Sequence, residues 1–318
     1  FASFLQAGYM ALENFFVDSP WILIMSLMTL PALAYGGIRL ALFCMFTVYF
    51  WGAVDMWEVS MQTLALMGLS VILSVILGVI LGIFSSQSDR FENFLKPILD
   101  TMQVMPAFVY LFPAMFFFGI GGAPAILATL IYAMPPIIRL TNLGIRQVSK
   151  ETIESAESFG SNKYQLLFKI KIPMALPSIM MGVNQTIMMA LALVVLATFI
   201  GAEGLGGQVW QAIRKLDVGW AMEGGLCILF MAIMFDRLSS AISKDKETLP
   251  NDVEKFYLLP QNLQRYPLAN LIELPLRIIV KLTHLIFSNI INIFASFFDS
   301  SISIFNKSYS GIIKNFMN

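Results

Sequence analysis

Long runs of apolar residues alternate with short polar stretches along most of this chain. A helix needs roughly 20 apolar residues to cross a membrane, and seven runs approach or reach that length. They cover residues 20–35, 38–51, 60–84, 104–118, 123–140, 177–200 and 219–238. The first two runs are short and are separated by Gly36, Gly37 and Arg39. The pattern predicts an all-α polytopic membrane protein with about seven spans.

Glycines mark places where we expect close helix contacts or turns. Gly78 and Gly82 have the spacing of small residues that lets two membrane helices approach, although glycine is also common in such helices without a contact. The three glycines within residues 119–122 predict a tight turn between two spans. Residues 201–207 predict a second turn, which leads into a short amphipathic helix over residues 209–216.

A charged segment, residues 149–173, interrupts the apolar pattern. Its lysines and glutamates are too costly to place in hydrocarbon, so the segment is expected to face water. Two amphipathic helices are predicted, over residues 149–159 and 161–171, with Gly160 as the hinge because such a turn often needs a positive φ. We expect Pro173 to end the second helix.

Composition agrees with a membrane protein and excludes several other classes. Hydrophobic residues make up 58% of the chain, charged residues 13%, and the mean hydropathy is +0.75. The net charge of zero gives no field that would attract nucleic acid. Phosphate-loop, zinc-protease, CxxC and nucleophile-elbow motifs are absent. We therefore expect no catalytic, metal or cofactor site in this chain.

The distribution of Lys and Arg predicts the orientation. If the charged segment is cytoplasmic, the cytoplasmic side of the membrane carries twelve of the Lys and Arg residues up to residue 246. The other side carries only Arg214 and Lys215. The twelve are Arg39, Arg90, Lys96, Arg139, Arg146, Lys150, Lys163, Lys169, Lys171, Arg237, Lys244 and Lys246. The N-terminus is then outside and the C-terminus in the cytoplasm. Residues 1–19 predict a helix lying in the membrane interface.

The charged segment resembles the cytoplasmic coupling loop of type I, binding-protein-dependent ABC importers. That resemblance rests on Glu154, Ser155 and Ala156, on Gly160 in register, and on the closing Ile172 and Pro173. Further stretches resemble the glycine betaine/proline betaine permeases, in one order across residues 56–238. These are MQVMPAFVYLFP at 102–113, FGIGGAP at 118–124, PPIIRLTNLGIRQV at 135–148 and MGVNQT at 181–186.

The resemblance implies a permease subunit of an ATP-driven importer for glycine betaine, proline betaine or a related trimethylammonium compound. It implies two ATPase subunits carrying ATP and Mg, an external substrate-binding protein and a second copy of this chain. Residues 56–243 would be the permease core, after peripheral segments over residues 1–55. Another small solute, such as choline, carnitine, trimethylamine N-oxide or an amino acid, is the alternative. An ATP-independent channel or an osmosensor is a more distant one.

Candidate site residues follow from this reading. The coupling residues are Glu154, Ser155, Ala156, Gly160, Ile172 and Pro173. Glu154 would fix the register against the ATPase; the alternative is that its carboxylate only contacts water on the surface of the helix. Polar and aromatic groups in the spans are candidates for the pathway: Gln103, Tyr110, Tyr132, Asn184, Gln185 and Thr186. For the adjacent amides, hydrogen bonding between helices is the alternative. The resemblance assigns Gly201, Gly204 and Gly206 to an outer gate.

The tail, residues 244–318, differs from the core. Residues 244–267 contain three prolines and predict a linker. Beyond them, polar residues recur at steps of three and four, which predicts a helix with one polar face. We expect this helix to lie on the membrane, with Arg277 and Lys281 near lipid headgroups. An eighth span over residues 282–298 and packing against a partner protein are the alternatives.

Overall fold

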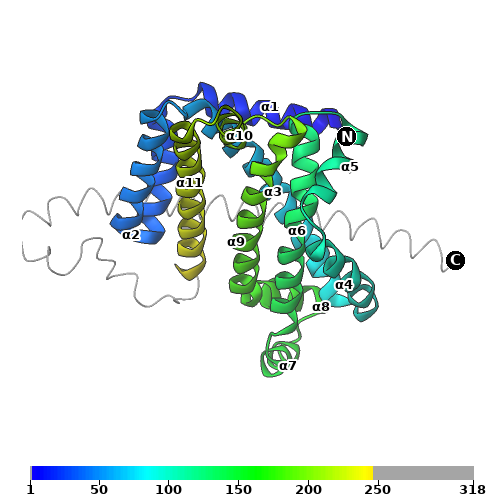
Figure 1. The fold of residues 1–318 in the computed structure, drawn as a ribbon. Coiled ribbons are helices and arrows are strands. Elements are labelled where there is room, and N and C mark those ends of the chain that lie inside the picture. Colours follow the sequence, from blue (N-terminus) through cyan, green and yellow to red (C-terminus); the bar gives the residue numbers. More distant parts are fainter. Residues whose placement is uncertain (1, 246–318) are drawn as a thin grey trace, which may run out of the picture. The chain divides into compact units, whose positions relative to one another are not determined.

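The computed structural model describes residues 2–245 of the 318-residue chain, and that part consists of helices joined by short turns (Figure 1). The predicted tail helix, with Arg277 and Lys281, lies outside the described residues. The helices are α1 (Ala2–Asp18), α2 (Trp21–Ala53), α3 (Trp57–Gln87), α4 (Asp89–Val104), α5 (Phe108–Phe118), α6 (Gly122–Arg146), α7 (Lys150–Ser158), α8 (Lys163–Gln165), a π-helical turn η1 (Leu166–Lys171), α9 (Ile172–Leu196), a 3-10 turn η2 (Ala197–Ile200), α10 (Leu205–Lys215) and α11 (Val218–Asp245).

The predicted all-α membrane fold is confirmed, and the seven apolar runs correspond to fewer separate helical elements. Among the described residues five helical segments are long and apolar enough to cross a membrane, or six if α4 and α5 form one span bent by 99°. Residues 20–35 and 38–51 belong to the single element α2. The run over residues 104–118 holds only the 11-residue α5, which at 1.5 Å per residue is about 16 Å long and too short to span alone.

Helix α2 is broken at Gly37, where φ is 75° and ψ is −176°. The break falls where the sequence separates the two short apolar runs. Figure 1 shows the two halves of α2 side by side. The second half packs on α11, where Phe230 contacts the rings of Phe43, Phe46 and Phe50.

Helices α3, α6 and α9 form the centre of the fold. A Cβ on Gly78 would lie 2.2 Å from Cγ2 of Ile137, and one on Gly82 would lie 2.9 Å from the carbonyl oxygen of Ile138. The close contact predicted from the glycine spacing is therefore confirmed between α3 and α6. Gly144 makes the same kind of approach to Ala175 and Ser178 of α9.

Helix α1 crosses one end of α3 and α6 (Figure 1). The side-chain oxygen of Gln6 accepts a hydrogen bond of 3.2 Å from the backbone N–H of Ala123. The ring of Tyr9 lies 2.8 Å from where a Cβ on Gly122 would be, so a glycine is needed at that crossing. Burial, together with the carboxylate of Glu13, raises the pKa of Tyr9 above its usual range. The predicted N-terminal helix is confirmed over Ala2–Asp18, and its place in a membrane interface stays a prediction.

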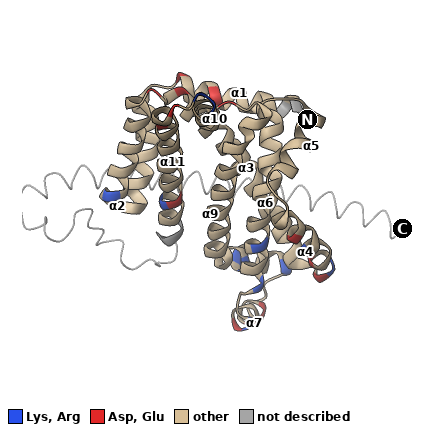
Figure 2. Cartoon of the chain, in the orientation of Figure 1, with Lys and Arg blue, Asp and Glu red and all other residues tan. Residues whose placement is uncertain are grey.

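Charged residues divide between the two ends of the bundle (Figure 2). Lys and Arg gather around α4, α7 and the start of α9, whereas Arg214 and Lys215 end α10 at the opposite end. This grouping places the predicted cytoplasmic residues of the core at one end of the spans.

Candidate functional site

The first helix of the charged segment, α7, has a defined cap at each end. The Ser149 hydroxyl accepts a hydrogen bond of 3.3 Å from the backbone N–H of Thr152. At the other end Gly160 adopts a φ of 82°. The N–H groups of Gly160 and Ser161 donate to the carbonyls of Glu157 and Ala156, which completes a Schellman motif. The predicted helix and its glycine hinge are confirmed.

Helix α7 presents most of its surface to solvent. Among residues 150–158 only Ala156 is buried, while Glu154 and Ser155 are exposed. Phe159, which follows the helix, is 90% exposed. In Figure 1 α7 projects beyond the ends of α6 and α9. The helix is therefore capped at both ends and largely exposed.

The second part of the charged segment differs from the prediction. A capping box starts α8, because Asn162 and Gln165 exchange side-chain to backbone hydrogen bonds of 2.8 and 2.9 Å. The chain then stays helical through η1 into α9. Pro173 does not end a helix: it lies in the first turn of α9, directly after the π-helical turn η1. Ile172 is half-buried and Pro173 is exposed.

Ion pairs connect α4 to the last turns of α6. Arg146 contacts Asp89 at 2.7 Å and Glu92 at 3.0 Å, and Arg139 pairs with Asp100. Asn142 donates a hydrogen bond of 2.8 Å to Glu92. Sequence reasoning did not find this network. The signal was available in the seven-residue spacing of Arg139 and Arg146, which puts both on one face of a helix.

The pathway candidates do not converge on one site. Tyr110 is buried, donates its hydroxyl to the carbonyl of Met102 and packs edge-to-face on Tyr132, with ring centroids 5.6 Å apart. Gln103 is exposed near the end of α4. Thr186 is fully buried, and its hydroxyl has no hydrogen-bond partner among the described residues. Only the two tyrosines touch.

The adjacent amides of α9 face different surroundings. Asn184 is hydrogen-bonded to α11, through a 3.4 Å contact with Asp236 and through the Ser239 hydroxyl. Gln185 is exposed. It lies on a face of α9 whose other exposed large side chains include Met174, Met181 and Met188. The structure thus assigns interhelical hydrogen bonding to Asn184 and an outward-facing amide to Gln185.

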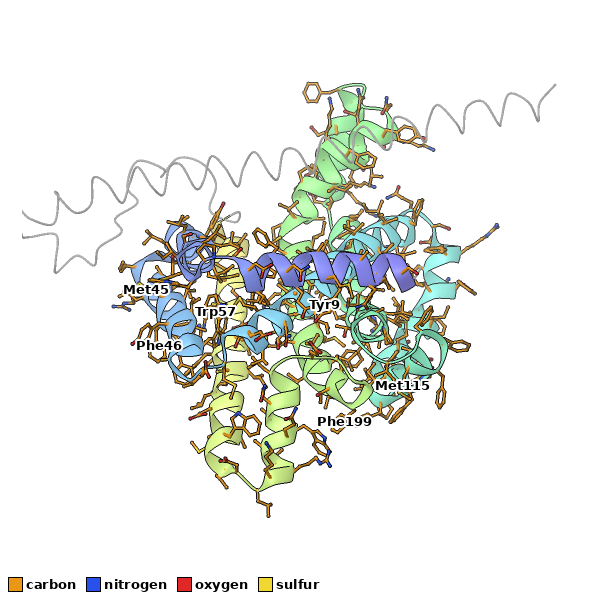
Figure 3. All side chains as sticks on the ribbon, turned by 90° about the horizontal axis from the view of Figure 1, so that it is seen from above. Tyr9, Met45, Phe46, Trp57, Met115 and Phe199 are labelled. Atoms are coloured by element: carbon orange, nitrogen blue, oxygen red, sulfur yellow. The ribbon has the colours of Figure 1, made fainter. Side chains whose placement is uncertain are left out.

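A row of aromatic rings connects η2, the 3-10 turn that follows α9, with the neighbouring helices α5 and α10. Phe199 contacts Trp210 of α10 at 4.9 Å and Phe108 of α5 at 5.5 Å between ring centroids. Phe112 stacks on Phe108 at 6.0 Å. Each of these four side chains is at least 40% exposed. Figure 3 looks down on this end and shows Phe199 between α5, marked by Met115, and α10. We call Phe108, Phe112, Phe199 and Trp210 the aromatic row.

The glycines assigned to an outer gate each have a backbone or packing requirement. Gly201 and Gly204 have φ values of 80° and 131°. A Cβ on Gly206 would lie 2.3 Å from the carbonyl oxygen of Val195. Thr63 of α3 holds the same turn, because its hydroxyl accepts a hydrogen bond of 2.8 Å from the N–H of Leu205. These glycines therefore shape a tight turn fixed to α3.

A cavity of about 860 Å³ opens between this turn, the start of α3 and α10, and we call it the outer cavity because Gly201 and Gly204 of the predicted outer gate line it. Its acidic lining residues are Glu58 and Glu203, and Glu203 accepts a hydrogen bond of 3.1 Å from Gln62. Arg214 and Lys215 line it as well. Trp210 both lines the cavity and belongs to the aromatic row. Sequence reasoning had not joined these residues, because they come from segments about 140 residues apart.

Comparisons with known proteins give the family. Residues 74–244 match the family described as binding-protein-dependent transport system inner membrane component. The glycine betaine/carnitine transport permease protein GbuB of Listeria monocytogenes serotype 1/2a (strain 10403S) is 49% identical over 191 residues, which cover 60% of this chain and 68% of that protein. The glycine betaine/proline betaine transport system permease protein ProW of Escherichia coli (strain K12) is 44% identical over 200 residues, 63% of this chain and 56% of that protein.

Solved structures agree with this assignment at the level of the fold. The MetNI methionine ABC transporter, in an inward-facing conformation, matches with a TM-score of 0.56 and 17% identity, over 59% of this chain and 94% of that one. The expected resemblance to betaine permeases and the expected ABC importer fold are both confirmed. The chain belongs to the inner membrane components of binding-protein-dependent transport systems.

Proposed function

We propose that this chain is the permease subunit of an ATP-driven importer for a compatible solute, namely glycine betaine, proline betaine or a related trimethylammonium compound. The names of its relatives support the solute class. Two copies of the chain would enclose the pathway, and an external binding protein would deliver the solute. Two separate ATPase subunits would hold ATP and Mg. The chain would itself hydrolyse nothing and carry no cofactor.

The observation that carries this proposal is the exposed helix α7. A transport subunit without its own nucleotide site needs a rigid contact through which a partner's movement reaches the spans. Caps at both ends keep α7 rigid, and its surface is free. Docking would use Glu154, Ser155 and Ala156, with Gly160 fixing the hinge and with Ile172 and Pro173 joining the segment to α9. Movement of α7 would then reach α6 and α9, on either side of it in the chain.

The pathway would run along the exposed face of α9. Gln185 is the exposed amide on that face, and the methionines beside it are flexible and polarizable. Gln103, Tyr110, Tyr132, Asn184 and Thr186 would support that face or the packing behind it. The turn with Gly201, Gly204 and Gly206 would close its outer end.

We propose that the α7 end faces the cytoplasm and the α1 and α10 end faces outward. The excess of Lys and Arg around α4, α7 and the start of α9 supports this orientation. The N-terminus would then be outside, and the tail with Arg277 and Lys281 would lie on the cytoplasmic side, near anionic lipid.

The test uses the complex purified with its ATPase and reconstituted in lipid. ATP hydrolysis is measured with binding protein and glycine betaine for the wild type, Gly160→Val and Gly160→Asn. Asparagine tolerates a positive φ and valine does not. We expect stimulation by loaded binding protein in the wild type and the asparagine variant, and its loss in the valine variant. If no ATPase co-purifies and the valine variant behaves like wild type, a channel or sensor function replaces this proposal.

A further inference from the structure

We propose that the outer cavity is a low-affinity binding site for a zwitterion that carries a trimethylammonium group and a carboxylate. The inference rests on the proposed function, because it places that solute class at a defined point on the permease. The binding protein would release solute here, and the aromatic row would lead it toward the exposed face of α9.

The trimethylammonium group fits the aromatic end of the cavity. Such a cation is diffuse and weakly hydrated, and the faces of aromatic rings attract it, tryptophan most strongly. Trp210 lines the cavity with a ring that is 40% exposed. Phe199, at 4.9 Å from that ring, extends the aromatic surface out of the cavity toward Phe108. The exposed parts of these neighbouring rings would give a cation successive aromatic contacts beyond the cavity.

The carboxylate fits the basic end of the cavity. Arg214 follows Trp210 by four residues in α10, so both lie on one face, about 6 Å apart along the helix. That separation suits the short span between the two charges of a betaine. Lys215 also lines the cavity, but its ammonium lies over the ring of Trp220 at 4.8 Å. Arg214 takes part in no ion pair within residues 2–245, so its guanidinium is the better partner for a carboxylate.

The acidic residues add attraction without fixing the cation. The carboxylate of Glu203 accepts a hydrogen bond from the side-chain amide of Gln62, and Glu58 is exposed at the start of α3. Exposed charges are screened by water and salt, so neither holds a cation tightly. With two carboxylates and two basic groups, the lining is balanced in charge. A balanced and open lining suits a site that must release its solute quickly.

The experiment measures solute binding to the permease–ATPase complex without binding protein. Saturation-transfer NMR detects weak binding through the methyl protons of glycine betaine, with choline as the probe that lacks a carboxylate. Trp210→Ala should reduce both signals at least fivefold, and Trp210→Phe should restore most of them. Trp21→Ala is the matched control, because Trp21 is exposed and does not line the cavity, and it should leave both signals unchanged.

Arg214→Gln separates the two ends of the site, and it changes an exposed side chain that the fold does not need. It should weaken the betaine signal several-fold and leave the choline signal intact. Equal signals in the wild type, Trp210→Ala and Arg214→Gln would overturn the inference. ATP hydrolysis stimulated by loaded binding protein is measured on the same samples. Stimulation without a cavity signal would remove this inference alone, whereas no response to betaine in either assay would remove the proposed solute class.

Discussion

Arg146 and Glu92 meet at 3.0 Å between the last turn of α6 and the first turn of α4. Both side chains are about one third exposed, and Arg146 also donates a hydrogen bond of 3.1 Å to the carbonyl of Ser85. One guanidinium thus joins α3, α4 and α6 four residues before α7 begins. The contact lies where movement of α7 would first reach the spans.

Replacing Arg146 by glutamine should loosen α4 without unfolding the bundle. The variant loses two ion pairs and a charge-assisted hydrogen bond, together worth about 1–3 kcal/mol. Hydrogen exchange measured by mass spectrometry should show faster exchange across residues 89–104. Arg90→Gln is the control, because Arg90 is exposed and makes no ion pair within residues 2–245. Equal exchange in the two variants would show that the network does not hold α4.

The glycine contact between α3 and α6 predicts a stability difference between two glycines of the same helix. In Gly82→Ala the new methyl group meets Thr141 at 2.6 Å and the Ile138 carbonyl at 2.9 Å. Such overpacking costs about 1–3 kcal/mol, so the midpoint of thermal unfolding in detergent should fall by several degrees. A methyl group on Gly68 meets nothing within 4 Å, so Gly68→Ala should unfold at or above the wild-type temperature. A Gly82→Ala variant as stable as wild type would contradict the packing described here.

Asn184 and Gln185 should respond to substitution in opposite ways. Asn184→Ala breaks the contact with Asp236 and Ser239 and leaves their polar groups without that partner, which costs about 1–3 kcal/mol. Its unfolding midpoint should fall. Gln185→Ala removes an exposed amide and should leave the midpoint unchanged while altering solute uptake in reconstituted vesicles. Normal uptake in Gln185→Ala would place the pathway away from this face of α9.

Thr63 should control the order of the turn over residues 201–207. Thr63→Val preserves the side-chain shape but removes the hydroxyl that accepts from the buried N–H of Leu205. An unsatisfied buried donor costs about 1–3 kcal/mol, so limited proteolysis should cut this turn faster. Thr101→Val removes a hydroxyl from an exposed side chain on α4 and serves as the control. Protease resistance equal to that of the control would show that α3 does not hold the turn.

Local features of the fold were predictable from the sequence because a few neighbouring residues determine them. Gly160 sets the end of α7, and the spacing of Gly78 and Gly82 predicts the contact with α6. The break in α2 falls at Gly37, where apolarity is interrupted. In each case one residue type satisfies a backbone or steric requirement that other residues do not.

Features that depend on distant segments were not predictable in this way. A proline such as Pro173 is common both just after a helix and in the first turn of one, so the local sequence does not distinguish the two positions. The structure does, because the chain continues as a helix from η1 into α9. The hydroxyl of Tyr110 donates a hydrogen bond to the backbone carbonyl of Met102. The partners of Arg146 lie more than 50 residues away in sequence. Single-sequence reasoning does not provide such pairings.

The fold-back of α2 at Gly37 has a consequence for topogenesis. A segment that enters the membrane and returns to the same side adds an even number of crossings. It therefore does not change the direction in which any later helix crosses the membrane. The direction in which α3 enters the membrane is therefore independent of whether residues 21–53 insert before or after it. The insertion machinery can establish the polarity of the transport core from α3 onward and add the α2 hairpin against α11 as a later step.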